Sequence, residues 1–153
     1  MSQSVTVEEA AGLLLKADRI LLLTHQYPDG DTIGSGYALC RALQSLGKTA
    51  RVACSDEIPD KYAYMTQTVP SPAFEPAFIC AVDVADAKLL GPRLAPYAER
   101  VDLAIDHHAS HRDFQRYLLL DAAAPATALL IYDLLPCLGA VSYTHLTLPT
   151  NRE

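Results

Sequence analysis

Three short segments of this sequence contain side chains that commonly bind divalent cations. They are His25-Gln26-Tyr27-Pro28-Asp29-Gly30-Asp31, Val82-Asp83 and Asp106-His107-His108. Imidazole and carboxylate donors together suit Mn²⁺, Fe²⁺ or Zn²⁺ better than Ca²⁺, which prefers oxygen ligands alone. The sequence therefore predicts a mixed nitrogen and oxygen metal centre. The alternative is that these residues belong to ordinary turns and helix caps.

The first segment places two carboxylates on either side of a glycine. Pro28 fixes one backbone angle and Gly30 permits a tight turn, so Asp29 and Asp31 can both face one cavity. An ordinary Asp-Gly turn followed by a helix cap would explain the same residues. The stretch Gly34-Ser35-Gly36 comes next in the sequence. It would add backbone N–H groups and the positive end of a helix dipole near an anion, but by itself it is not specific.

The other two segments need a comparable choice between structural and chemical roles. Asp86 is the better candidate for capping the next short helix, which leaves Asp83 free to bridge metal ions. Adjacent side chains of an extended chain point to opposite sides. We therefore expect one of His107 and His108 to bind metal while the other faces substrate, with Asp106 orienting a histidine from outside the ligand set.

The elements that must position these residues are visible as apolar runs separated by helical patterns. The predicted strands span 19–24, 50–54, 77–82, 101–105 and 117–120, and the predicted helices follow Thr6, run from about Thr32 to Gly47, and span 127–135. This alternation predicts an α/β fold of three layers, with a mainly parallel sheet flanked by helices. Ligands of such sheets bind beyond the carboxyl ends of the strands, where His25, Asp83 and Asp106 are expected to lie.

Composition limits the function classes that remain. The net charge is −6, and no basic stretch suits electrostatic binding of long duplexes, so bound metal ions would have to supply positive charge for a phosphate substrate. No apolar run reaches the roughly 20 residues of a membrane span, and the N-terminus does not resemble a signal peptide. We therefore expect a cytoplasmic protein without a membrane partner. The four cysteines form no CxxC pair, which argues against a disulfide or zinc framework.

Taken in order, the three motifs resemble the DHH phosphoesterase family. The matching residues are His25 to Ser35, Val82 to Asp86, and Asp106 to His108. The sequence is most similar to the branch of bifunctional oligoribonucleases that also act on 3′-phosphoadenosine 5′-phosphate. Family II inorganic pyrophosphatases share the metal core. Their first motif usually reads Pro-Asp-Thr-Asp, so Gly30 favours the nucleotide branch.

The resemblance implies a centre of two Mn²⁺ ions. The implied ligands of the first ion are His25, Asp29 and Asp83. The implied ligands of the second ion are Asp31, Asp83 and His107, with Asp83 bridging. His108 would contact the scissile phosphate, and Asp106 and His108 would be the catalytic residues.

The implied activity is hydrolysis of short single-stranded oligonucleotides or small nucleotides, among them 3′-phosphoadenosine 5′-phosphate and pApA. Two alternatives stay open: a hydrolase like the inorganic pyrophosphatases, and a catalytically impaired fragment that only binds nucleotides. The full-length protein is also expected to be able to form a homodimer.

The sequence departs from the family pattern at several places. A fourth motif, an Asp in an Asp-Thr-Gly-like turn that completes the second ion's ligands, does not occur, nor does the C-terminal substrate-binding domain. We therefore expect residues 1–140 to form an incomplete DHH domain, residues 141–153 to be a non-native tail, and the second ion to lack one ligand. His111 stands where Asn is common, and Leu129 stands where Glu is common.

Overall fold

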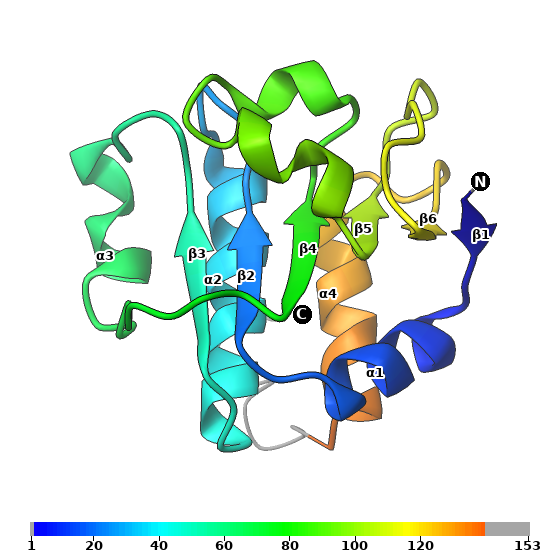
Figure 1. The fold of residues 1–153 in the computed structure, drawn as a ribbon, viewed down its shortest axis with the longest axis horizontal. Coiled ribbons are helices and arrows are strands. Elements are labelled where there is room, and N and C mark those ends of the chain that lie inside the picture. The colour runs from blue at the N-terminus through cyan, green and yellow to red at the C-terminus, as the bar shows by residue number, and fades with distance from the viewer. Residues whose placement is uncertain (1, 140–153) are drawn as a thin grey trace.

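The structure is a computed structural model in which residues 2–139 are described. They form one sheet of six strands in the order β1-β6-β5-β4-β2-β3, and every pair of neighbouring strands is parallel (Figure 1). The strands are β1 (Gln3–Ser4), β2 (Ile20–Leu23), β3 (Ala50–Ala53), β4 (Phe78–Val82), β5 (Leu103–Asp106) and β6 (Tyr117–Leu120). The predicted α/β class with a mainly parallel sheet is confirmed.

Helices cover both faces of this sheet and complete the three predicted layers. The helical segments are α1 (Val7–Lys16), α2 (Gly30–Ser45), η1 (Asp60–Tyr62), α3 (Ala63–Thr66), η2 (Ala87–Leu90), η3 (Ala95–Arg100) and α4 (Thr127–Cys137). The long helices α1, α2 and α4 share one apolar core with one face of the sheet. The short helices η2 and η3 lie on the opposite face, in front of the strands in Figure 1, over a second core. Because both faces are covered, all four residues of β2 are buried.

Strand β1 was not predicted. It consists of two exposed polar residues, Gln3 and Ser4, and has no apolar alternation that would mark a strand. Its formation depends on β6, since the Gln3 N–H donates to the Arg116 carbonyl and the Val5 N–H donates to the Leu118 carbonyl, both at 2.9 Å. A pairing between segments so far apart leaves no local signal in the sequence.

The strand order reverses beside β2. From β2 the chain passes to β3 on one side, and it then returns to β4 on the other side of β2. In open parallel sheets the loops that leave such a switch point diverge and open a crevice at the carboxyl ends of the strands. The residues that follow β2 and β4, among them His25 and Asp83, are placed at this point.

Gly91 lies at the contact between η2 and the loop after β3, close to this crevice. Its φ is +83°, and a Cβ at this position would lie 2.7 Å from both Cβ and Oγ of Ser55 and 3.2 Å from Cβ of Gln26. Ser55 fastens the same contact, because its hydroxyl donates to the Leu90 carbonyl at 2.8 Å. The position therefore requires glycine for two reasons, backbone conformation and space.

We expect Gly91→Ala to lower the free energy of unfolding by about 2–4 kcal/mol, the combined cost of overpacking and a left-handed backbone. Gly47→Ala is the matched control, because Gly47 has a φ of +87° but no surrounding atom within 4 Å of the place that a Cβ would take. The free energy of unfolding of that control should fall by only about 1 kcal/mol, because only the cost of the left-handed backbone applies. Urea denaturation of both variants measures the difference, and equal losses would contradict the steric argument.

Three further expectations concern the chain as a whole. None of the helices within residues 2–139 is long and apolar enough to cross a membrane. All four cysteines fall inside this range and are unpaired, with Cys40 and Cys80 buried. The expected non-native tail, residues 141–153, lies outside the described residues and stays a prediction.

Candidate metal centre

The crevice at the carboxyl ends of β2, β4 and β5 brings the predicted site residues together. His25 follows β2, Asp83 follows β4 directly, and Asp106 is the last residue of β5. The remaining members of the set are Asp29 and Asp31 at the start of α2 and His107 and His108 just after β5. None of the seven predicted residues lies away from the crevice.

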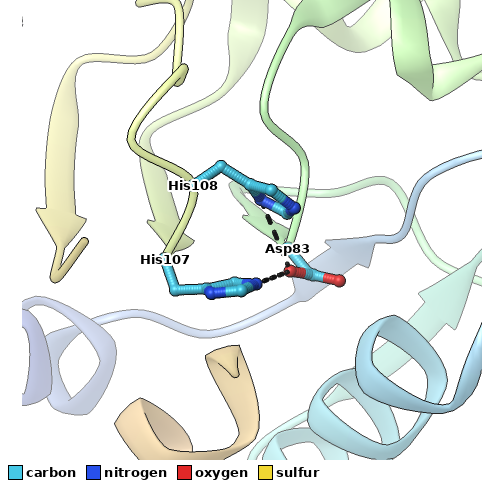
Figure 2. Close-up of side chains that lie close together, drawn as sticks. All are labelled: Asp83, His107 and His108. Atoms are coloured by element: carbon cyan, nitrogen blue, oxygen red, sulfur yellow. Dashed lines mark ion pairs between the residues drawn. The ribbon is translucent and has the colours of Figure 1, made fainter. Parts of the chain in front are cut away.

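Asp83 is at the centre of this group, and only 2% of its side chain is exposed. Its Oδ2 lies 3.5 Å from His25 Nε2. Its Oδ1 lies 3.6 Å from His107 Nε2 (Figure 2). The two oxygens of one carboxylate therefore face two different imidazoles. The backbone of Asp83 has a φ of 67°, a left-handed conformation that Asp tolerates better than most residues and that often marks functional sites.

The first donor group consists of His25 Nε2, Asp29 Oδ1 and Asp83 Oδ2. His25 Nε2 lies 3.7 Å from the Asp29 oxygen and 3.5 Å from the Asp83 oxygen. Two donors that bind one first-row ion at about 2.1 Å are themselves about 3.0–3.4 Å apart. Asp29 also caps α2, because its Oδ1 accepts a hydrogen bond from the Thr32 N–H at 3.0 Å. The cap interpretation and the ligand interpretation of Asp29 are compatible, since a carboxylate oxygen has two lone pairs.

The second donor group consists of His107 Nε2, Asp31 Oδ2 and Asp83 Oδ1. The His107 nitrogen lies 3.6 Å from each of the two oxygens. Asp83 contributes one oxygen to each group, and the ring of His108 also lies close enough to Asp83 and His107 to share a metal ion with them. The arrangement can hold two cations side by side with one carboxylate between them.

Backbone carbonyls fix the imidazoles of His25 and His107 in the tautomer that binding a metal would require. His25 Nδ1 lies 2.7 Å from the Gln26 carbonyl oxygen, and His107 Nδ1 lies 3.1 Å from the Ala124 carbonyl oxygen. A carbonyl oxygen only accepts, so each Nδ1 carries the proton, and in the neutral ring each Nε2 presents a lone pair to the crevice. This donor chemistry fits divalent metal ions of the Mn²⁺, Fe²⁺ or Zn²⁺ type.

The charges in the crevice disfavour its metal-free state. Burial, together with the negative charge of Asp83, raises the pKa of Asp31, although backbone N–H groups partly oppose this. The hydrogen bond to Asp83 raises the pKa of His25 despite the opposing effect of burial. Carboxylates crowded in this way repel one another, and bound cations would neutralise them.

Thr127, the first residue of α4, also belongs to this site, although no motif in the sequence indicates it. Its hydroxyl donates to Asp83 Oδ1 at 2.8 Å, and its N–H donates to Asp31 Oδ2 at 3.0 Å. The next N–H, from Ala128, donates to Asp31 Oδ1 at 2.9 Å. These partners lie 44 to 97 residues away along the chain, so no spacing in the sequence could reveal them.

His108 and Asp106 form a second layer above the donor groups. Asp106 is fully buried, and its Oδ1 accepts from His108 Nδ1 at 2.6 Å and from the His107 N–H at 2.8 Å. Although burial opposes it, hydrogen bonds from His111 and His108 lower the pKa of Asp106. His108 Nδ1 also lies 3.8 Å from Asp83 Oδ1, but its bond to Asp106 commits this nitrogen as a donor. The Nε2 of His108 is left for other partners.

The expectation that His107 and His108 point to opposite sides is wrong. Their ring centroids are 4.3 Å apart with the planes tilted by 46°, and both rings face Asp83 (Figure 2). The physical reason is that β5 ends at Asp106, so the strict alternation of a strand no longer applies to the two histidines.

His111 extends the hydrogen-bond network away from the crevice. Its Nδ1 lies 2.7 Å from Asp106 Oδ2, and its Nε2 lies 3.0 Å from Gln115 Oε1. That amide oxygen already accepts from the Phe114 N–H, so both imidazole nitrogens of His111 face acceptors. Although burial opposes it, the bond to Asp106 raises the pKa of His111. A protonated His111 beside an ionised Asp106 satisfies every partner in this network.

Two details of the glycine-rich segment differ from the prediction. Gly30 is the first residue of α2 and has no left-handed backbone, and the left-handed residue of this loop is Tyr27, with a φ of 56°. Gly34 and Gly36 lie beyond the first turn of α2, whose N–H groups alone are free of the helix. A Cβ on Gly36 would lie 3.2 Å from Cγ2 of Thr24, so this glycine allows α2 to approach the sheet.

Known proteins share the family and the fold of this chain. The model of the N-terminal domain of the DHH family matches residues 19–150, and the chain belongs to the DHH family. It is 31% identical over 126 residues to the bifunctional oligoribonuclease and PAP phosphatase NrnA of Thermus thermophilus, across 78% of this chain and 37% of that protein. The chain thus spans little more than a third of the length of this relative.

Solved structures show the same fold. An exopolyphosphatase-related protein of Bacteroides fragilis superposes with a TM-score of 0.77 at 24% identity, covering 89% of this chain and 44% of that one. RecJ of Thermus thermophilus in complex with Mn²⁺ superposes with a TM-score of 0.54 at 21% identity, covering 95% of this chain and 21% of that one. At these identities the similarity concerns the fold alone.

Proposed function

We propose that this chain is the metal-binding part of a hydrolase that cleaves phosphate esters of short oligonucleotides or small nucleotides and uses two Mn²⁺ ions. One observation carries the proposal: the two oxygens of Asp83 face two separate imidazoles at 3.5 and 3.6 Å. A single carboxylate shared in this way suits a pair of divalent ions. Such a pair, when bound, neutralises a phosphate and activates the attacking water.

The proposed ligands follow the two donor groups. The first ion is assigned to His25, Asp29 and Asp83. The second ion is assigned to Asp31, Asp83 and His107. These side chains hold their positions through contacts outside the two groups, because carbonyls orient both imidazoles and N–H groups of two helices bind the carboxylates.

His108 is the proposed contact to the scissile phosphate. It is the most exposed of the three histidines that face Asp83, with 39% of its side chain accessible. Asp106 holds its Nδ1 proton and thereby fixes the ring, so Nε2 is available toward a substrate above the metal pair. We assign Asp106 as the residue that orients His108 toward the substrate.

The nucleotide part of the proposal is supported by the relative from Thermus thermophilus, whose name assigns it oligoribonuclease and PAP phosphatase activity. Hydrolysis of inorganic pyrophosphate and nucleotide binding without turnover are the alternatives. All three would use the same metal centre, so the substrate must be decided by experiment.

The test is incubation of the chain with pApA, 3′-phosphoadenosine 5′-phosphate or pyrophosphate, each with Mn²⁺ or with EDTA, followed by chromatography of the products. We expect Mn²⁺-dependent release of AMP from the first two compounds. Release of phosphate from pyrophosphate alone would replace the nucleotide assignment with the pyrophosphatase alternative. Binding of Mn²⁺ and nucleotide without any product would favour the binding-only alternative.

A second expectation concerns stability. Mn²⁺ should raise the melting temperature of the chain, because it binds the folded crevice and relieves the repulsion among its carboxylates. At 100 times the dissociation constant the linkage contributes about 2.7 kcal/mol, which is about 5–10 °C for a chain of this size. Thermal melts monitored by circular dichroism with Mn²⁺ or EDTA measure the shift. An unchanged melting temperature in saturating Mn²⁺ would count against an intact metal centre.

A further inference from the structure

The loop before α4 and the first residues of this helix together contact every member of the second donor group. The Ala124 carbonyl accepts from His107 Nδ1 at 3.1 Å, and the Ala128 N–H donates to Asp31 Oδ1 at 2.9 Å. Thr127 lies between these contacts and binds two carboxylates at once, through its hydroxyl to Asp83 Oδ1 and through its N–H to Asp31 Oδ2. No other residue in the described part of the chain is seen to donate to both carboxylates.

The atoms that Thr127 binds are the same atoms that face His107. His107 Nε2 lies 3.6 Å from Asp31 Oδ2 and 3.6 Å from Asp83 Oδ1. A carboxylate oxygen has two lone pairs, so accepting a hydrogen bond from Thr127 leaves one pair on each oxygen for a cation. The hydrogen bonds therefore fix where the remaining lone pairs point. Within residues 2–139 they do so for the second donor group only, because Asp83 Oδ2 and Asp29 receive nothing from α4.

We propose that Thr127 is the positioning residue of the second metal ion, and that it sets the affinity for this ion without setting the affinity for the first. The inference rests on the proposed function, since it assumes that the two donor groups bind metal. It adds a role for α4 that the donor groups alone do not reveal. The N-terminal turn of this helix acts as a template that holds Asp31 and Asp83 at one distance from His107.

The hydroxyl of Thr127 is the part of this template that substitution can remove. Valine matches threonine in shape but has no donor, whereas serine keeps the hydroxyl and loses only a methyl group. Residues that orient metal ligands typically change metal affinity by about 10–100-fold when they are replaced. We therefore expect Thr127→Val to lower the affinity for the second Mn²⁺ ion by about 10–100-fold. The affinity of Thr127→Ser for this ion should stay within about threefold of the affinity of the parent.

The experiment combines Thr127→Val with variants that isolate each ion. His25→Ala removes a donor from the first group only, and His107→Ala removes a donor from the second group only. Binding is measured by the loss of the free Mn²⁺ signal in electron paramagnetic resonance as metal is added to chelator-treated protein. In the His25→Ala background, Thr127→Val should lower the affinity for the remaining Mn²⁺ ion by about 10–100-fold. In the His107→Ala background, it should leave the affinity for the remaining ion unchanged.

Thr24→Val is the matched control. Thr24 is as fully buried as Thr127, but its hydroxyl donates to the Ala53 carbonyl at 3.0 Å and to no carboxylate. It should lower the melting temperature without changing the affinity for either ion. Should Thr127→Val not fold, Thr127→Ala removes the same hydroxyl with less bulk and gives the same comparison.

Three results would overturn the inference. In the first, Thr127→Val lowers the affinity for both ions equally. In the second, it changes the affinity for neither ion. In the third, the parent chain binds fewer than two ions. A failure of the nucleotide assignment appears instead in the products of hydrolysis, where the number of bound ions plays no part. The two proposals can therefore fail separately.

Discussion

Replacing Asp83 with asparagine should abolish the binding of both Mn²⁺ ions at concentrations that saturate the parent chain. Each oxygen of this carboxylate faces a different imidazole, so a single substitution reaches both donor groups. Asparagine keeps the shape and tolerates the left-handed backbone, but it has one carbonyl oxygen, an N–H₂ group and no charge. Hydrolysis should fall by about 10³-fold or more, because in the proposed function a bound metal pair would supply most of the charge stabilisation of the reaction.

The same variant should not be destabilised when metal is absent. The charge of Asp83 contributes to the raised pKa of Asp31, and its removal relieves that repulsion. Asp83 also favours the protonated form of His25, so this relief and the lost attraction oppose each other. The metal-free Asp83→Asn protein should therefore melt close to the temperature of the parent, while the gain in melting temperature on adding Mn²⁺ disappears. Retained affinity for two ions in this variant would disprove the bridging role.

Asp86→Asn is the control for this prediction. Asp86 lies three residues further along the chain and caps η2 through the Lys88 N–H at 2.9 Å. Asparagine caps helices about as well as aspartate, so stability should change little. Mn²⁺ binding should be that of the parent. Isothermal titration of Mn²⁺ into both variants separates the loss of a bridging ligand from a general effect of removing charge near the crevice.

The fold could be predicted because its main strands carry their own signal. The apolar runs that became β2, β4 and β5 are continuous, as expected for strands covered on both faces, and each ends at or just before an acidic or imidazole residue. The start of the helix after Thr6 is equally local, because Thr6 and Glu9 form a capping box with both of its hydrogen bonds. Strand β1 carried no such signal, since its two residues are polar and only pairing with β6 makes them a strand.

The residues that meet in the crevice could be predicted from the sequence, but their geometry could not. The motifs place acidic and imidazole side chains after strands that a parallel sheet brings to one edge, which is a consequence of topology. The mutual orientation of His107 and His108 depends on the chain leaving β5, and the pattern of a strand could not show it. The role of Thr127 depends on contacts with Asp31 and Asp83 from the other end of the domain. Only the three-dimensional structure supplies such contacts.

His108→Gln should separate catalysis from metal binding more clearly than any other substitution in the crevice. The Nδ1 of His108 is held by Asp106 at 2.6 Å, and the proposal assigns its Nε2 to the scissile phosphate and to neither ion. Both Mn²⁺ ions should therefore bind with the affinity of the parent. Turnover should fall by about 10²–10⁴-fold, the usual contribution of a positioned acid or base.

The neighbouring substitution, His107→Gln, is the natural comparison, because the two rings lie 4.3 Å apart. His107 Nε2 faces two carboxylate oxygens of the second donor group, so its replacement should remove the second ion and turnover together. Electron paramagnetic resonance of bound Mn²⁺ and single-turnover hydrolysis of pApA, measured on both variants, give the two readouts. If His108→Gln also lost an ion, His108 would be a metal ligand, and the contact to the scissile phosphate would have to come from another residue.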